Sequence, residues 1–171
     1  MTTLARNVHV HVGGGAFLVV FLLSALAFSP APSRAEVSDS DILHDSVLEL
    51  AEVSTGGSYR TLSVSLEARE GQATLTARKD GVKSEAQLST EEALALWKTV
   101  LAAGIESLSD TPAAGAPADQ SRFTVSFRAG TAANSFTVYG VDSVADTRYR
   151  DIVREILHVT DARIYGKHWR K

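Results

Sequence analysis

The stretch "DSDILHD" brings three acids and one histidine together within seven residues, as Asp39, Asp41, Asp45 and His44. Carboxylate oxygens are the ligands that calcium prefers in proteins. A calcium-binding loop of the helix–loop–helix type also needs a glycine near its middle and a glutamate at its end, and the stretch contains neither. We therefore expect residues 36–46 to form a solvated acidic linker, and we predict no metal site.

The other residues that carry chemistry do not fall at catalytic spacings. Beyond the first 35 residues the histidines are His44, His158 and His168, with no H-E-x-x-H motif. The serines lack a G-x-S-x-G turn and a positioned base. Glu91 and Glu92 are explained by the preference of a helix N-terminus for acids. We predict no catalytic residue and a protein that is not an enzyme; an enzyme of an unfamiliar type is the alternative.

Two glycine-rich stretches are candidates for phosphate binding, which needs a glycine loop that opens a helix. The first, "GGG" at 13–15, precedes an apolar run near the N-terminus, and the second, "STGGSY" at 54–59, connects two predicted strands. Because neither leads into a helix, we predict no nucleotide and no other cofactor.

The apolar run itself covers residues 16–28 and contains no charge. A membrane-spanning helix needs about 20 apolar residues, whereas the core of a signal peptide needs about 7–15. Ser33 and Ala35 then supply small residues at the −3 and −1 positions of a cleavage site. We predict a signal peptide over residues 1–35, export to the periplasm or the medium, and no transmembrane span after cleavage. An uncleaved N-terminal anchor is the alternative.

Composition limits the rest of the chain. Of 171 residues none is cysteine, so thiol nucleophiles and thiolate metal sites are excluded. Removing 35 residues leaves 136, which is enough for one self-sufficient core. The net charge of −3 argues against a nucleic-acid partner. The last ten residues hold four bases and no acid, which predicts a basic tail over residues 161–171, either frayed or in contact with an anionic lipid or polymer surface.

Alternating apolar and polar residues predict strands over residues 46–53, 59–70, 72–79, 82–88, 122–128 and 134–141. Asp80 and Gly81 predict a tight hairpin turn between the third and fourth strands, because glycine accepts a positive φ. The first four strands therefore form a meander.

Two segments change to helical spacing. In "LSTEEALALWKTVLAAG", Ser89 and Glu92 form a capping box, and Gly104 suits the position after the last helical residue. Trp97 shares a face with leucines, so we expect it in the core. A second helix is predicted over residues 147–159, with a buried face of Tyr149, Ile152, Val153, Ile156 and Leu157.

The element order is therefore β-β-β-β-α-β-β-α. It predicts one α+β domain over residues 47–160, an antiparallel sheet with both amphipathic helices packed on one face. The other face, rich in Thr, Ser and Arg, is expected to meet water. We assign to it the arginines at positions 60, 69, 78, 122 and 128.

Loops are the remaining candidates for a site, because rigid scaffolds carry their binding residues on loops. The candidate loops are residues 54–59, 110–120 and 129–134. Within them and in the tail, the candidate interaction residues are Gly56, Gly57, Tyr59, Asp119 and Trp169. Trp169 is included because it stands outside every periodic segment and among basic residues.

Taken together, these features resemble the emfourin-type domains, small bacterial proteins named for inhibitors of thermolysin-like metalloproteases. The similar part runs from about residue 47 to about residue 157. It consists of a first strand ending in Gly56-Gly57, the helix "LSTEEALALWKTVLAAG", a Pro/Ala loop, the strand "RFTVSF" and a last helix with Tyr149, Ile152, Val153 and Leu157. The sequence departs from the family at Asp119-Gln120, where the family often has Asp-Gly before an aromatic residue. The resemblance implies a non-enzymatic binding module with a protein partner that it does not identify, and a secreted protease is one candidate.

We therefore expect an exported, non-enzymatic binding domain with a protein partner, as a protease inhibitor or as an interaction module of the cell envelope. The alternative is a domain that binds a hydrophilic ligand or a surface polymer through the polar Thr/Arg face of its sheet.

Overall fold

The computed structural model describes residues 37–54, 60–112 and 120–166. The signal peptide expected over residues 1–35 lies outside this range. The elements, in chain order, are α1 (Asp39–His44), β1 (Asp45–Ser54), β2 (Arg60–Arg69), β3 (Gln72–Lys79), β4 (Val82–Leu88), α2 (Thr90–Ala102), the 3₁₀ turn η1 (Ile105–Ser107), β5 (Arg122–Ala129), β6 (Ala132–Tyr139), α3 (Thr147–Thr160) and the π-helical turn η2 (Asp161–Tyr165).

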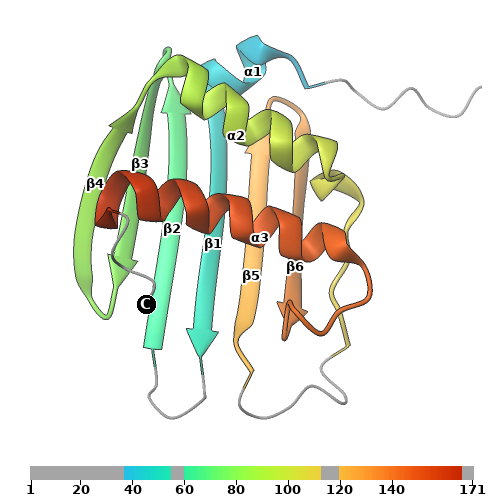
Figure 1. The fold of residues 1–171 in the computed structure, drawn as a ribbon. Coiled ribbons are helices and arrows are strands. Elements are labelled where there is room, and N and C mark those ends of the chain that lie inside the picture. The colour runs from blue at the N-terminus through green and yellow to red at the C-terminus, as the bar shows by residue number, and fades with distance from the viewer. Residues whose placement is uncertain (1–36, 55–59, 113–119, 167–171) are drawn as a thin grey trace, which may run out of the picture. The chain divides into compact units, whose positions relative to one another are not determined.

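The strands form one antiparallel sheet in the order β4-β3-β2-β1-β5-β6. Helices α2 and α3 cross the same face of this sheet, and α2 carries the chain from the β4 edge towards the β5–β6 side (Figure 1). The predicted α+β class, the order of the six strands and two long helices, and the placement of both of these helices on one face are confirmed, and α1 before β1 is an additional element. None of the helices in the described part of the chain is both long and apolar enough to cross a membrane.

The sheet buries one face because its apolar residues alternate in register across neighbouring strands. Leu48 on β1 lies opposite Leu66 on β2 and opposite Phe127 on β5, and all three are less than 5 % exposed. The β3–β4 turn adopts the predicted form, with φ of 49° at Asp80 and 88° at Gly81. Two consecutive positive φ values are typical of the type I′ turn, whose twist matches that of the strands it joins.

The ends of α2 agree with their sequence signals. The Ser89 hydroxyl accepts a hydrogen bond from the Glu92 amide at 3.3 Å, and the Glu92 carboxylate accepts one from the Ser89 amide at 3.0 Å. Gly104 follows the helix with a φ of 78°. Between these ends, Trp97 is fully buried and makes a T-shaped contact with the Phe127 ring, with 6.1 Å between ring centroids.

The described part of the expected solvated linker, residues 37–46, differs from the prediction. Ser38 and Asp41 form a second capping box, which begins helix α1, and Ile42 in this helix is fully buried. Lys98 on α2 binds Asp39 at 3.0 Å. The prediction was wrong because it treated the acids as a solvated run, whereas acids in the first turn stabilise a helix N-terminus and a single apolar residue anchors the helix to the core.

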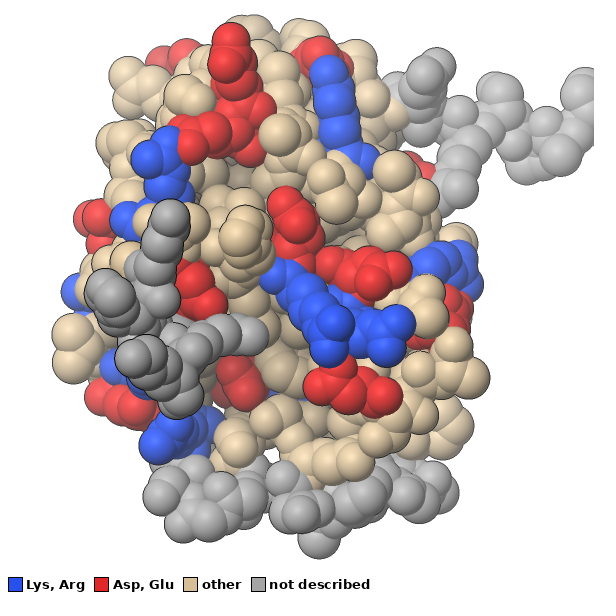
Figure 2. Space-filling view, in the orientation of Figure 1, with Lys and Arg blue, Asp and Glu red and all other residues tan. Residues whose placement is uncertain are grey.

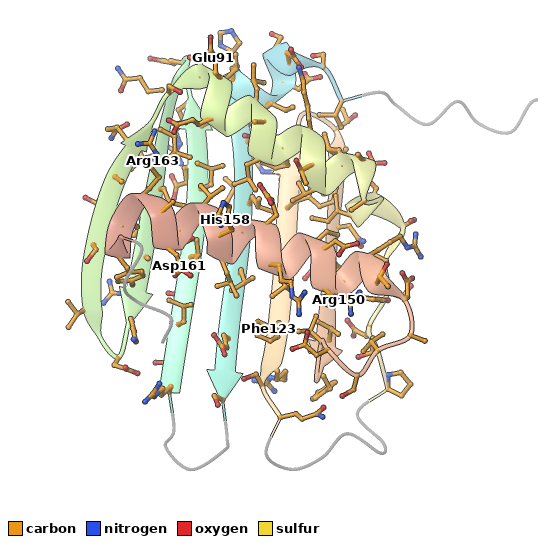
Figure 3. All side chains as sticks on the ribbon, viewed as in Figure 1. Glu91, Phe123, Arg150, His158, Asp161 and Arg163 are labelled. Atoms are coloured by element: carbon orange, nitrogen blue, oxygen red, sulfur yellow. The ribbon has the colours of Figure 1, made fainter. Side chains whose placement is uncertain are left out.

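The expected basic tail also begins inside the domain. Residues 161–165 continue α3 as the turn η2, and Ile164 and Tyr165 pack against the core. Arg163 forms an ion pair with Glu92 at the start of α2, and Figure 3 shows Arg163 between the end of α3 and the start of α2. Residues 161–165 of the expected tail thus contribute to the fold. Residues 167–171 lie outside the described part.

Candidate binding cleft at the loop end of the sheet

A cleft of about 730 Å³ opens at the end of the sheet where β1 ends and β2 begins. Its walls come from the ends of β1 and β3, the starts of β2 and β5, helix α3, the segment before β5 and the turn after β6. The lining residues are Glu52, Ser54, Arg60, Thr61, Leu62, Lys79, Gln120, Ser121, Phe123, Gly140, Val141, Asp142, Ser143, Val153, Arg154 and Leu157. Segments far apart in the sequence therefore converge on one site.

The floor of the cleft is apolar. Leu62 and Phe123 are the last inward-facing apolar positions of their strands at this end of the sheet, and Phe123 lies below α3 in Figure 3. Val153 and Leu157 approach from α3, and Val141 from the turn after β6. None of these five side chains is more than 8 % exposed, so a ligand would reach them only through the polar rim.

A carboxylate stands within this floor. Glu52 follows Leu48 and Leu50 at the inward positions of β1, and it lies opposite Leu62 on one side and Phe123 on the other. The Ser121 hydroxyl donates a hydrogen bond of 3.0 Å to Glu52. Sequence reasoning missed this residue, although its parity with the two leucines was a usable signal: an acid at an inward position of a central strand usually has a specific partner.

Three cations reach the same cleft from separate elements. Arg154 on α3 binds Asp142 at 2.8 Å, and Lys79 lies at the end of β3. Arg60, at the start of β2, makes no ion pair with any residue in the described part of the chain. Our assignment of Arg60 to the polar sheet face was wrong, because it shares the alternation of Leu62 and therefore lies on the helix side, where it lines the cleft.

The wall formed by the turn after β6 depends on a glycine. The Gly140 amide donates to the Ser121 carbonyl oxygen at 3.0 Å, and the Gln120 side chain donates to the Ser143 hydroxyl at 3.0 Å. A Cβ atom at Gly140 would lie 1.5 Å from the Gln120 carboxamide oxygen, and the φ of Gly140 is +57°. Glycine thus allows the turn and the segment before β5 to come into contact, and this contact closes one side of the cleft.

On the opposite face of the sheet, several polar side chains form hydrogen bonds and ion pairs with one another. Arg128 binds Asp45 through both guanidinium ends, at 2.6 and 3.0 Å, and this contact lowers the pKa of Asp45 below its usual value. Ser126 donates to Glu49 at 3.0 Å in the same way. A smaller hollow of about 290 Å³ remains near the middle of this face, lined by Glu49, Leu50, Ala51, Ser63, Val64, Ser65, Thr76, Arg78, Thr124 and Ser126.

Charge alone does not mark a site on the helix face. Figure 2 shows acidic and basic side chains next to one another over α3, with no large area of one sign. Within the described part of the chain, no three His, Asp or Glu side chains gather in a way that would hold a metal ion. His44 and His158 are both exposed, and neither lines the cleft.

The described ends of two of the three candidate loops contribute to the cleft. Ser54 and Gln120, at the described ends of the loops 54–59 and 110–120, both line it. The third loop, 129–134, lies at the other end of the sheet, where Gly130 approaches Asp41 of α1. The five candidate interaction residues, Gly56, Gly57, Tyr59, Asp119 and Trp169, lie outside the described residues.

No protein-family model and no curated protein matches this sequence.

Proposed function

We propose that this chain is an exported, non-enzymatic binding domain that holds its protein partner in the cleft at the loop end of the sheet. The observation that carries the proposal is the construction of this cleft. It joins an apolar floor to a polar rim, and its lining comes from four strands, helix α3, the segment before β5 and the turn after β6. Sites for recognition combine apolar area with a few placed polar groups in this way.

The charges of the cleft favour a particular kind of partner segment. Arg60 forms no ion pair with an acid among the described residues. An acidic group of the bound protein could therefore form an ion pair with Arg60 without displacing a native one. Leu62 and Phe123 offer apolar contact beneath it. The preferred partner segment therefore carries an acidic side chain close to an apolar one.

The resemblance to emfourin-type domains supports a finer version of the proposal, in which the partner is a thermolysin-like secreted protease. In that case the chain from residue 36 should slow such a protease at a near-stoichiometric ratio. Arg60→Glu should abolish the effect by reversing the charge at the cleft, whereas Arg78→Glu on the opposite face should leave it unchanged. Full activity of every protease in a secreted panel rejects the inhibitor version.

The broader proposal has its own test. The chain from residue 36 is used to capture partners from the envelope and medium of the source cells, in parallel with the variants Arg60→Glu and Arg78→Glu. A partner that is lost with Arg60→Glu and kept with Arg78→Glu supports the cleft. A partner whose capture depends on Arg78 and not on Arg60 contradicts it.

A second candidate function uses the polar sheet face, and one observation favours it. In the hollow of about 290 Å³, the Ser65 hydroxyl is buried and has no hydrogen-bond partner among the described residues. A hydroxyl-rich ligand such as a glycan would satisfy it. This version predicts a ligand-dependent rise in melting temperature across a glycan panel, and Arg78→Glu should remove that rise while Arg60→Glu preserves it.

A further inference from the structure

The two edges of the sheet differ in how the outward-facing backbone groups of the edge strand are hydrogen-bonded. On the β6 edge, the Thr111 amide donates to the Thr137 carbonyl oxygen at 2.9 Å, and Asp110 accepts from the Thr137 amide at 2.6 Å. The Tyr139 amide donates to the Thr111 hydroxyl at 3.1 Å. The segment before the cleft therefore covers this edge. Within the described residues, no comparable backbone hydrogen bond covers the outer side of β4, which forms the other edge of the sheet (Figure 1).

The hairpin register identifies the open groups on β4. A two-residue turn at Asp80-Gly81 makes Lys79 and Val82 a hydrogen-bonded pair, and such pairs then alternate with non-hydrogen-bonded ones along the ladder. The backbone groups of Lys83, Glu85 and Gln87 must therefore point away from β3. They form a short row of donors and acceptors that an antiparallel strand could complete.

We propose that β4 pairs antiparallel with β4 of a second copy of this chain, about a two-fold axis at Ser84. In this register Lys83 of one copy lies opposite Glu85 of the other, and the reverse pair is identical by symmetry. Lys83 and Glu85 already form an ion pair within one chain, so the two copies would join two such pairs into a network of alternating charge. Opposite charges on directly facing positions stabilise a strand pair.

The same register accounts for an exposed apolar side chain. Val82 is 69 % exposed and is the one exposed large apolar residue in the described part of the chain. With the axis at Ser84, Val82 lies opposite Ala86 of the second copy, on the helix side of the sheet. Moving the axis by one residue to Glu85 would instead place the two Glu85 carboxylates opposite each other, which is unfavourable. The charges therefore favour the axis at Ser84 over one at Glu85.

Because the chain contains no cysteine, a single introduced thiol can report this geometry. Residues on the axis form a non-hydrogen-bonded pair with Cα atoms about 4.5 Å apart, which is within reach of a disulfide. Ser84→Cys should therefore cross-link into a dimer under mild oxidation. Gln87→Cys is the control, because its symmetry mate would lie about 20 Å away. A lack of cross-linking by Ser84→Cys, or equal cross-linking by both variants, overturns the proposal.

Charge exchange gives a second, independent test. Lys83→Glu or Glu85→Lys alone places like charges opposite each other, and sedimentation equilibrium should show at least a severalfold weaker association. The double exchange Lys83→Glu with Glu85→Lys restores opposite charges and should restore association. If the chain is a monomer at every concentration, Lys83 and Glu85 protect the edge from pairing, and the proposal fails. The proposed pairing of β4 does not depend on the proposed function of the cleft, so either proposal can fail without the other.

Discussion

The Ser46 hydroxyl donates a hydrogen bond of 2.6 Å to the carbonyl oxygen of Ile42, and both residues are fully buried. This bond joins the end of α1 to the start of β1, the central strand next to β2 and β5. The segment that its sequence predicts to be a solvated acidic linker is thus attached to the middle of the sheet.

Ile42→Ala should therefore lower the free energy of unfolding by about 2–5 kcal/mol, which is typical of removing a buried isoleucine side chain. Val82→Ala is the control, because Val82 is 69 % exposed and surface substitutions change stability by about 0.5 kcal/mol or less. Urea unfolding at low protein concentration measures both. Equal effects of the two substitutions would show that α1 does not contribute to the core.

The capping box of α2 should have a measurable effect of its own. Ser89→Ala removes the acceptor of the Glu92 amide and should destabilise the protein by about 1 kcal/mol. Thr90→Ala, one residue later and exposed, should change stability little. Thermal unfolding monitored by circular dichroism compares them; a melting temperature that falls equally in both variants would argue against the cap.

Gly140→Ala should destabilise the protein for two reasons that a control can separate. A left-handed alanine costs about 1–2 kcal/mol, and its Cβ would also displace the Gln120 side chain. Gly71→Ala has a similar positive φ of +81° with no atom within 4 Å of the added Cβ, so it carries the backbone strain alone. We expect Gly140→Ala to be the more harmful substitution in urea unfolding, and the addition of Gln120→Ala to reduce the difference. Identical effects of the two glycine substitutions would contradict the steric account.

Acid should weaken the fold. Hydrogen bonds from Arg128 hold the pKa of Asp45 below its usual value of 3.8, and Arg148 does the same for Asp146. A carboxylate whose pKa is lowered in the folded state contributes its stability above the unfolded pKa and loses it as the pH falls through the folded pKa. Stability should therefore be nearly constant above about pH 5 and decline below about pH 4.

Urea unfolding across this pH range measures the decline. Arg128→Gln should make it shallower, because the pKa of Asp45 then moves back towards its usual value. Both partners are exposed, so the effect on stability at neutral pH should be small. A protein that becomes more stable on acidification would contradict the assignment.

Much of the fold follows from local patterns in the sequence. The alternation in residues 122–128, the spacing of Ile152, Val153 and Ile156, and the capping signal at Ser89 each depend on neighbours within a few positions. These patterns fix strand, helix and element order, because a strand shows its two faces at every second residue and a helix end needs its cap nearby.

The cleft and the position of β4 at an edge of the sheet were decided by the tertiary structure. Glu52, Arg60 and Arg154 come from three elements, and no local pattern in the sequence relates them. The burial of Ile42 likewise depends on the sheet beneath α1. Only the lateral order β4-β3-β2-β1-β5-β6 decides which strand ends converge at the cleft and which strand is left at an edge. Sequence alone did not determine that order, because strand neighbours are set by long-range pairing and by the packing of two helices on one face.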